Sequence, residues 1–327
     1  MRDFLAEANL RTDLAVEAHE MIAQKGPGKR EIPGLSLNVE NDQEIKITRV
    51  GIHSPEAEQA MGKPQGNYVT IESPGLRYKN TSLQQEAMRV LAKEISAMSK
   101  LPATATVLIV GLGNWNVTPD ALGPKTVEKV VITRHLKSML SPELRANVRS
   151  VCAVAPGVLG ITGIETVEIV SGIVNKLRPD LVIAIDALAA SSSYRVITTI
   201  QLADTGISPG SGVGNKRFGL SQASLGVPVL AIGVPTVVHA STIAVDTISI
   251  LQQQAAFARY FRSLADLSEQ ERQTIISQVL PETLGDLMVT PKEVDRLIDD
   301  IADILAGGIN QSMHPQIDYS NIHMYLH

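Results

Sequence analysis

Two aspartates follow apolar, β-branched segments and are well placed for hydrolytic chemistry. Asp186 ends the run 181–186, and Asp120 lies in the Gly- and Pro-rich stretch 111–124 that follows the run 106–110. Apolar runs of this length predict buried strands. Catalytic groups of open α/β sheets collect beyond the carboxyl ends of strands, so both carboxylates are expected in one crevice. Two close carboxylates share a proton, which supplies an acid and a base for attack of water on an amide.

Each aspartate also has a structural interpretation. Thr118-Pro119-Asp120 is typical of a first helical turn, although Gly123-Pro124 would end such a helix after about one turn. Asp186 would equally serve as the N-cap of a following helix. The occurrence of both residues at strand ends, rather than either one alone, favours the catalytic interpretation.

The elements expected around these residues alternate between strands and helices. Strands with period-two alternation are predicted at 44–50 and 67–72, and Ser82 with Gln85 predicts a capped helix to about Lys100. Further strands are expected at 106–112, 150–155, 180–186, 197–202 and 228–234, and helices at 125–137, after Thr162 with Glu165, and from about 239. This order predicts an α/β fold whose largely parallel sheet has helices on both faces, with N-terminal β additions.

The two ends of the chain differ in their predicted structure. Residues 1 to about 30 are charged and are expected to be loosely attached. The C-terminal part is expected to be helical, with one helix capped by Ser268 and Glu271. Another is predicted to begin at Thr290-Pro291 and to end at Gly307-Gly308. No linker divides the chain into independent domains.

Composition and charge exclude several classes of protein. The net charge of −5 over 327 residues provides no basic surface for nucleic acid. Cys152 is the only cysteine, so an intrachain disulfide is impossible and a reducing, cytoplasmic interior is expected; inside a buried strand its thiol would be inert. The N-terminus has no signal-peptide core, and the most apolar stretch, 227–251, is interrupted by prolines and Asp246, which argues against a membrane span.

Two glycine-rich segments leave a nucleotide-binding module as an alternative. The loop 206–217 ends in Lys216 and Arg217 but lacks the Gly-Lys-Ser/Thr ending of a P-loop. It is more typical of a substrate-binding loop. Gly111-Leu112-Gly113 begins a dinucleotide fingerprint, but Asn116 replaces its third glycine. Both nucleotide signals are therefore incomplete.

No histidine or cysteine motif predicts a metal or another cofactor. None of the seven histidines forms a His-Glu-x-x-His pair, and no Cys/His cluster is present. His239 starts a predicted helix after an apolar strand and is interpreted as structural. A metal-dependent peptidase that uses the two aspartates as ligands remains the rival enzyme class, although no convincing third ligand is evident.

The segments that carry Asp120 and Asp186, with five others, resemble the germination protease family of spore-forming bacteria, endopeptidases that degrade small acid-soluble spore proteins. The matching stretches are 11–17, 111–124, 155–166, 182–190, 204–217, 226–238 and 287–295. The resemblance implies a fold similar to hydrogenase-maturation proteases, a homotetramer, synthesis as a zymogen, and essential aspartates at Asp120 and Asp186. It also implies a location in the developing forespore and spore core. Asn114, Trp115 and Asn116, with the two cations of the 206–217 loop, are candidates to line the cleft.

This sequence departs from the family's longer members in two places. The segment from about 252 to 266 looks shortened, and His239 stands where some relatives have an acid. The nickel-binding hydrogenase-maturation proteases, which use acids and a histidine, keep the metal-dependent alternative open.

The N-terminus contains a candidate self-cleavage site. The family's substrates are cut after an acidic residue in a segment resembling Thr-Glu-Phe/Ile-Ala-Ser-Glu, and residues 12–17 repeat that pattern. We therefore expect the zymogen to cut itself between Asp13 and Leu14. This cut would release residues 1–13 as a propeptide and leave 14–327 as one peptidase domain. An exposed helix start capped by Thr12 is the structural alternative, and a frayed terminal helix would still present the bond.

Overall fold

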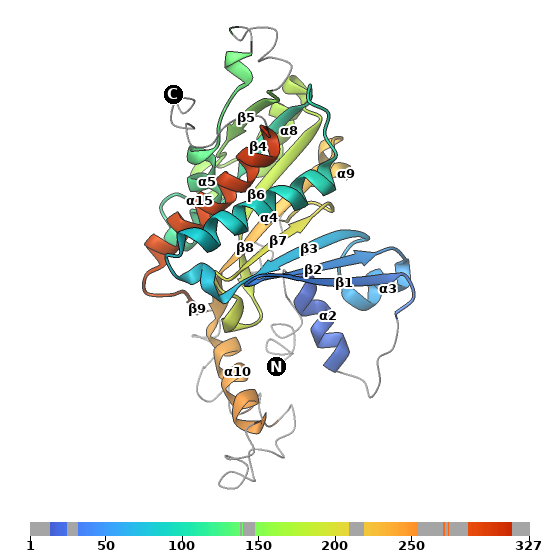
Figure 1. Ribbon diagram of the computed structural model, residues 1–327, viewed down its shortest axis with the longest axis vertical. Coiled ribbons are helices and arrows are strands. Elements are labelled where there is room, and N and C mark those ends of the chain that lie inside the picture. Colours follow the sequence, from blue (N-terminus) through green and yellow to red (C-terminus); the bar gives the residue numbers. More distant parts are fainter. Residues whose placement is uncertain are drawn as a thin grey trace.

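All nine described strands belong to a single sheet (Figure 1). The computed structural model describes residues 14–24, 32–137, 139, 148–208, 219–253, 271, 274 and 287–315. The strands lie in the order β1-β2-β3-β7-β8-β6-β4-β5, and β9 pairs with β8. Their bounds are β1 Leu35–Asp42, β2 Ile45–Ile52, β3 Gly66–Glu72, β4 Thr106–Gly111, β5 Ser150–Val154, β6 Leu181–Ala190, β7 Thr199–Ala203, β8 Val229–His239 and β9 Met288–Val289.

Four neighbouring strands, β8, β6, β4 and β5, form the parallel half of the sheet. Most of their side chains are apolar on both faces, as expected for strands that are covered on both sides. The predicted α/β fold with a parallel centre is therefore confirmed. Strand β6 extends four residues beyond its predicted end at 186, and β8 extends five residues beyond its predicted end at 234. The two strands pair with each other out to Ala190 and Val238.

The antiparallel half consists of β1, β2, β3 and β7, and joins the parallel half where β7 pairs with β8. The N-terminal β additions are thereby confirmed. The edge strand β1 was not predicted. Most of its side chains are exposed, including Leu37 and Val39, so its sequence lacks the contrast between buried and exposed positions that marks β2.

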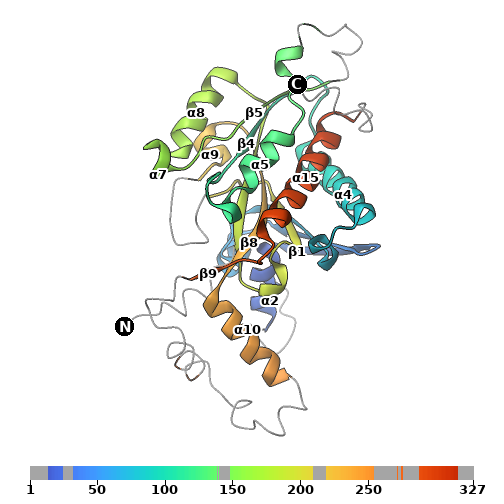
Figure 2. The same cartoon turned by 90° about the vertical axis from the view of Figure 1, so that its left-hand side faces the viewer.

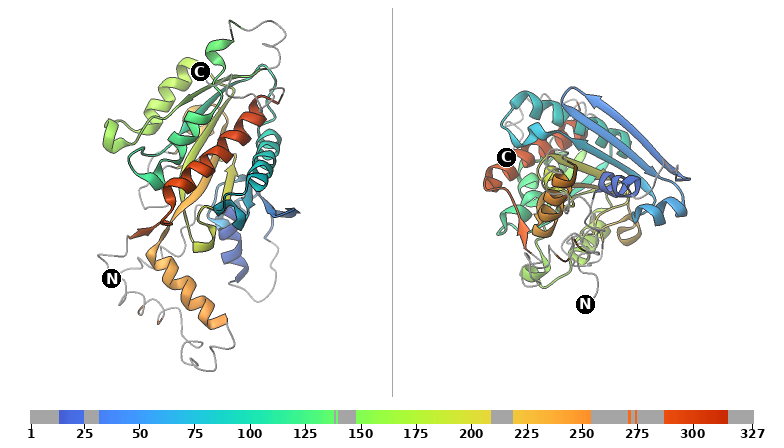
Figure 3. Two further views of the ribbon diagram at one scale, coloured as in Figure 1. Left: turned by 60° about the vertical axis from the view of Figure 1, so that its left-hand side comes forward. Right: turned by 90° about the horizontal axis from the view of Figure 1, so that it is seen from below.

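Helices cover both faces of the sheet (Figures 2 and 3). Helices α4, α5 and α15 pack on one face around the largest core, and α8 with α9 pack on the other face of the parallel half. On that second face, α2 and α3 cover the antiparallel half. The helices are α2 Ala15–Gln24, α3 Pro55–Met61, α4 Thr81–Ser99, α5 Leu122–Lys129, α7 Leu159–Thr162, α8 Thr166–Leu177, α9 Gln222–Leu225, α10 Ala240–Gln253 and α15 Val294–Met313, with 3-10 turns η1 Pro74–Arg77, η2 Thr118–Asp120, η3 Arg134–Leu136 and η4 Ser193–Arg195.

Several predicted helix caps lie at other residues. The side chain of Asn80, not Ser82, accepts a hydrogen bond from Leu83 N and caps α4. Glu165 rather than Thr162 caps α8, in a capping box with Glu168. Sequence patterns identify a cap only to within a few residues, because several neighbouring polar side chains can reach the same free amides.

The prediction for the last helix was wrong at both ends. Helix α15 begins at Val294 rather than at Thr290-Pro291, and it continues through Gly307-Gly308 to Met313. A Cβ at Gly308 would collide with the side chain of Leu91 on α4, so the two glycines allow a close helix crossing instead of ending the helix. The Ser268 cap lies outside the described residues.

The expectation of a loosely attached N-terminus is also wrong for the part that is described. Leu14 and the first turn of α2 are buried, because their apolar side chains pack against the sheet. In the described part of the chain, no helix has both the length and the apolar composition needed to cross a membrane.

Candidate active site

Asp186 lies in the middle of β6, not at its end. The pairing of β4 with β6 ends at Gly111 with Ile185, one residue before Asp186. On the other side of β6, Asp186 pairs with Gly233 of β8. Its side chain is 5% exposed, and one carboxylate oxygen accepts a hydrogen bond from Ala187 N at 2.9 Å. The helix-cap alternative is therefore wrong, because the backbone remains extended after Asp186. The carboxylate nevertheless lies where β4 ends.

Asp120 lies in the loop that begins at that end of β4. The loop forms a single 3-10 turn, η2, and is closed by two hydrogen bonds from Asn114 N, one to the carboxylate of Asp120 at 2.9 Å and one to its carbonyl at 3.2 Å. Gly113 has φ +113°, and a Cβ there would collide with the Asp120 carbonyl. The conformation of this loop therefore requires glycine at position 113.

The residues after Asp120 differ from their predicted role. Gly123 and Pro124 do not end a helix but lie in the first turn of α5, which begins at Leu122. A Cβ at Gly123 would collide with the backbone of Leu112 and approach the carbonyl of Ile185, so glycine lets α5 start directly against the strands. α5 is thereby fixed next to β4 and β6.

The structure brings the two aspartate-bearing segments together at one edge of the sheet. Leu112 N, at the start of the loop, donates a hydrogen bond to the carbonyl of Ile185 at 2.8 Å. Ile185 immediately precedes Asp186. The η2 turn that ends at Asp120 contacts both β6 and β8. Strand and loop therefore meet at this edge.

The other predicted cleft residues have different positions. Asn114 is half-buried and its side-chain oxygen accepts a hydrogen bond from Asn116 N at 3.0 Å, which stabilises the loop. Trp115 is 44% exposed, so much of its indole is accessible to solvent. Lys216 and Arg217 lie outside the described residues, as does Asp13.

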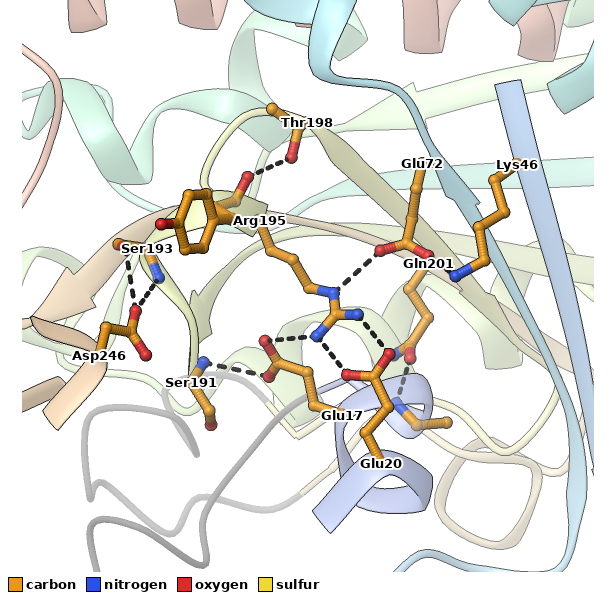
Figure 4. A network of polar contacts seen from close by, with 12 residues as sticks. Glu17, Glu20, Lys46, Glu72, Ser191, Ser193, Arg195, Thr198, Gln201 and Asp246 are labelled. Carbon is orange, nitrogen blue, oxygen red and sulfur yellow. Dashed lines mark hydrogen bonds and ion pairs between the residues drawn. The ribbon is translucent and has the colours of Figure 1, made fainter. Parts of the chain in front are cut away.

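Sequence reasoning missed the group of side chains that fastens α2 to the sheet (Figure 4). Arg195 forms ion pairs with Glu17 at 3.5 Å, Glu20 at 2.8 Å and Glu72 at 2.9 Å. Glu17 is 2% exposed and also accepts a hydrogen bond from Ser191 N at 3.0 Å. Burial opposes the charge on Arg195, but hydrogen bonds and Coulombic attraction from Glu20 and Glu72 raise the pKa of the guanidinium above its usual value.

Leu14, the first described residue, is fully buried next to the strand that carries Asp186. Its side chain packs in a cluster with Val16, Leu188 and Ile207. The following amide, Ala15 N, donates a hydrogen bond to the side-chain oxygen of Gln201 at 2.6 Å. The chain just after the predicted cleavage bond is therefore held at the sheet.

The remaining sequence candidates are His239, Cys152 and the two glycines at 111 and 113. His239 is the last residue of β8 rather than the start of a helix, and it pairs with Met288 of β9. Cys152 is half-buried in β5, and burial raises the pKa of its thiol, which disfavours the reactive thiolate. Within the described ranges, no group of three His, Cys, Asp or Glu side chains is placed to hold a metal. The glycines at 111 and 113 do not open a helix, since α5 begins only at Leu122.

Comparisons with known proteins identify relatives along almost the whole chain. A family model described as germination protease matches residues 15–262 and 251–326. A germination protease of Caldanaerobacter subterraneus subsp. tengcongensis is 49% identical over 97% of this chain and 98% of its own length. The germination protease of Clostridium tetani is 46% identical over 97% of this chain and 99% of its own.

Two further matches differ in what they can support. A Bacillus cereus germination protease is 44% identical over an alignment of 362 positions, longer than this chain, that covers 99% of it and 98% of the relative. A crystal structure of a NiFe hydrogenase maturation protease from Thermococcus kodakarensis covers 66% of this chain and 98% of its own at 18% identity. Its TM-score of 0.29 is too low to carry an argument.

Proposed function

The chain belongs to the germination protease family, and from that premise we propose that it initiates the degradation of small acid-soluble spore proteins during germination. Membership of this family makes the chain a peptidase that acts in spore germination. The substrate, the catalytic groups and the processing of the chain are our proposals. The observation that carries the assignment of the catalytic groups is the hydrogen bond between Leu112 and Ile185, which fastens the Asp120 loop beside Asp186.

In the proposed mechanism the two aspartates divide the proton transfers of amide hydrolysis. One carboxylate accepts a proton from water as its oxygen attacks the scissile carbonyl. The other carboxyl donates a proton to the leaving amine as the C–N bond breaks. Two carboxyl groups that share one proton provide both functions. The burial of Asp186 supports this assignment. Where water is excluded, a carboxylate interacts more strongly with the charge that develops in the transition state.

The substrate is tested by incubating the purified chain with a small acid-soluble spore protein and measuring the masses of the products. We expect cleavage at a small number of bonds, each after an acidic residue, and release of peptides without covalent modification of the enzyme. An intact substrate after prolonged incubation with the processed, folded enzyme would contradict the proposal. A chain with both aspartates changed to asparagine controls for contaminating peptidases.

We further propose that the chain is a zymogen that cuts itself between Asp13 and Leu14. The packing of Leu14 on Leu188 supports a cut within one chain. Leu188 is two residues beyond Asp186, about 7 Å along an extended strand, and on the same face. The idea of an exposed, frayed helix is not needed, because the buried Leu14 is already on the face that carries Asp186.

Two measurements test this processing. N-terminal sequencing of the matured chain should begin at Leu14, and any other start would reject the site. An Asp186→Asn chain mixed with active enzyme should keep its N-terminus, because its Leu14 is buried in its own sheet. Rapid trimming of that chain by the active enzyme would instead show that cleavage occurs between molecules.

The remaining family properties are also part of the proposal. We propose one peptidase domain over residues 14–327, a homotetrameric assembly, and a location in the developing forespore and spore core. The sheet supports the single domain, because β2 near the N-terminus and β9 near the C-terminus belong to it. Light scattering of the purified chain measures the assembly, and a mass near four times 35.1 kDa is expected.

A further inference from the structure

Strand β1 forms one edge of the sheet, and within the described residues it has a neighbouring strand on one side only. Figure 1 shows β1 with β2 and β3 as the blue strands that extend away from the parallel half. Proteins usually protect such edges with very short strands, lysines, prolines or bulges. β1 has eight residues, contains no lysine or proline, and pairs with β2 in an unbroken register. This edge therefore lacks the usual features that prevent another strand from adding to a sheet.

The hairpin between β1 and β2 determines which backbone groups of β1 point outward. Asp42 pairs with Ile45 across a two-residue turn, and the pair that closes such a turn is hydrogen-bonded. In antiparallel pairs, hydrogen-bonded and non-hydrogen-bonded positions alternate along the strand. Leu37 and Val39 are therefore non-hydrogen-bonded positions toward β2, and their N–H and C=O groups point away from it. These groups can form the backbone hydrogen bonds of a further strand.

The same two residues carry exposed apolar side chains. Leu37 is opposite Val50 of β2, which packs in the core under α2 and α3, and Val39 is opposite Thr48. Opposite residues of two paired strands share a face, so both side chains lie on the α2 face of the sheet. Leu37 is 46% exposed and Val39 is 48% exposed. A strand added at this edge would cover both side chains and bond their backbone groups.

The two acids of β1 are neutralised within the chain. Glu40 forms an ion pair with Arg49 of β2 at 2.8 Å, and Asp42 forms one with Arg89 of α4 at 2.6 Å. The chain as a whole has a net charge of −5, so two copies repel each other on average. Because the acids of β1 are compensated by neighbouring cations, this edge is a surface where two copies can approach with little repulsion.

A strand of the same sequence fits this edge by symmetry. A two-fold axis at Asn38 would align two β1 strands antiparallel and place Leu37 of each copy opposite Val39 of the other. The outward backbone groups of these residues would then bond each other. In the same register, Glu40 of one copy would lie opposite Ser36 of the other, so that no acid faces an acid. The apolar, polar and charged positions of β1 are therefore complementary to themselves.

We propose that β1 pairs with β1 of a second copy, antiparallel about Asn38, so that one sheet runs through two copies of the chain. This inference rests on the homotetramer proposed above and names one of the surfaces that would build it. The contact is isologous, because the same strand serves on both sides, and it closes after two copies. A tetramer therefore needs a second, different contact between such pairs.

A disulfide across the two-fold axis tests the register. The two copies of residue 38 would form a non-hydrogen-bonded pair with Cα atoms about 4.5 Å apart, a distance that a disulfide spans. Full-length Asn38→Cys should therefore form a covalent dimer under mild oxidation. Asn41→Cys is the matched control on the same exposed strand, because its two copies would be about 20 Å apart. The unmodified chain controls for Cys152. No dimer of Asn38→Cys, or equal dimer formation by both variants, would overturn the proposal.

Light scattering of folded variants tests the contact without a crosslink. Val39→Lys should lower the mass of the assembly about twofold, because the lysine charge would be buried between the paired strands. Val117→Lys is the matched control, since Val117 is 47% exposed and lies far from β1 in the chain, and it should leave the mass unchanged. An unchanged mass of Val39→Lys, or an equal fall in both variants, would overturn the proposal. If Asn38→Cys crosslinks but the unmodified chain has only twice the mass of one chain, the strand pairing stands and the homotetramer fails.

Discussion

The parallel and antiparallel halves of the sheet are built differently and have different tasks in this account. The parallel half is apolar on both faces and carries Asp186 at the point where β4 ends. The antiparallel half exposes much of its first strand and is joined to α2 by charged side chains around Arg195. Apolar strands therefore hold the proposed catalytic groups, while ion pairs hold α2, the helix that follows the proposed cleavage bond.

The largest expected effect concerns the catalytic half. Asp186→Asn and Asp120→Asn should each lower kcat by about 10³-fold or more, because each removes a group that transfers a proton. The thermal unfolding midpoint should change little. The measurement is steady-state cleavage of a spore-protein substrate. Asp303→Asn, a change at an exposed ion pair with Lys129, is the control and should keep full activity.

The next effect concerns the antiparallel half. Arg195→Met should lower the free energy of unfolding by about 3 kcal/mol, because it leaves the buried Glu17 without its cationic partner. Chemical denaturation measures this loss. Arg296→Met removes an exposed pair with Asp300 and should cost less than about 1 kcal/mol. Equal costs for the two variants would show that the Arg195 ion pairs do not hold α2.

Stability should also fall in mild acid through a histidine that supports the parallel half. His314, at the end of α15, is fully buried, and burial lowers its pKa from 6.5 to about 4. Between these values the unfolded chain binds the proton more strongly than the folded chain. The free energy of unfolding should therefore decrease as the pH falls from about 6.5 to about 4, by about 3 kcal/mol in total.

Chemical denaturation at a series of pH values measures this decrease. The free energy of unfolding of His314→Gln should fall less steeply with decreasing pH over the same range. An unchanged slope would assign the acid sensitivity to other groups.

The smallest effect separates the position of Asp120 from its chemistry. Gly113→Ala removes neither carboxyl group, but its Cβ pushes against the Asp120 carbonyl, so kcat should fall about 100-fold because the loop displaces the Asp120 carboxylate. Gly160→Ala is the matched change, because a Cβ at Gly160 meets no atom within 4 Å. It should leave kcat unchanged. Loss of activity in both variants would contradict the claim that the loop conformation at Gly113 positions Asp120 for catalysis.

The sequence predicted the parallel half of the fold better than the rest. Its strands are continuous apolar runs, and such runs are recognisable locally. For the same reason the sequence did not locate the end of β6. Residues 187–190 are as apolar as those before Asp186, so no change in the pattern marks where the strand ends. The exposed strand β1 lacks the contrast on which the prediction depends.

The site was predictable in part for a related reason. Asp120 follows an apolar run, Asp186 closes one, and both match a family pattern, so the residues alone led to the proposal of both as catalytic. Their catalytic role stays a prediction. The contact between Arg195 and Glu20 joins positions 175 apart in the chain, and no local spacing encodes it. The close crossing at Gly308 was missed in the same way, because a glycine in a helix is compatible with a helix end until the opposing side chain of Leu91 is known.

The most direct test of the central claim is a double-mutant cycle on the two aspartates. kcat is measured for the unmodified chain, Asp120→Asn, Asp186→Asn and the double variant, each folded and assayed with the same spore-protein substrate. If the carboxylates act as one unit, the double variant should be no more than about tenfold slower than the slower single variant. Full activity of either single variant, or losses that multiply in the double variant, would contradict the account.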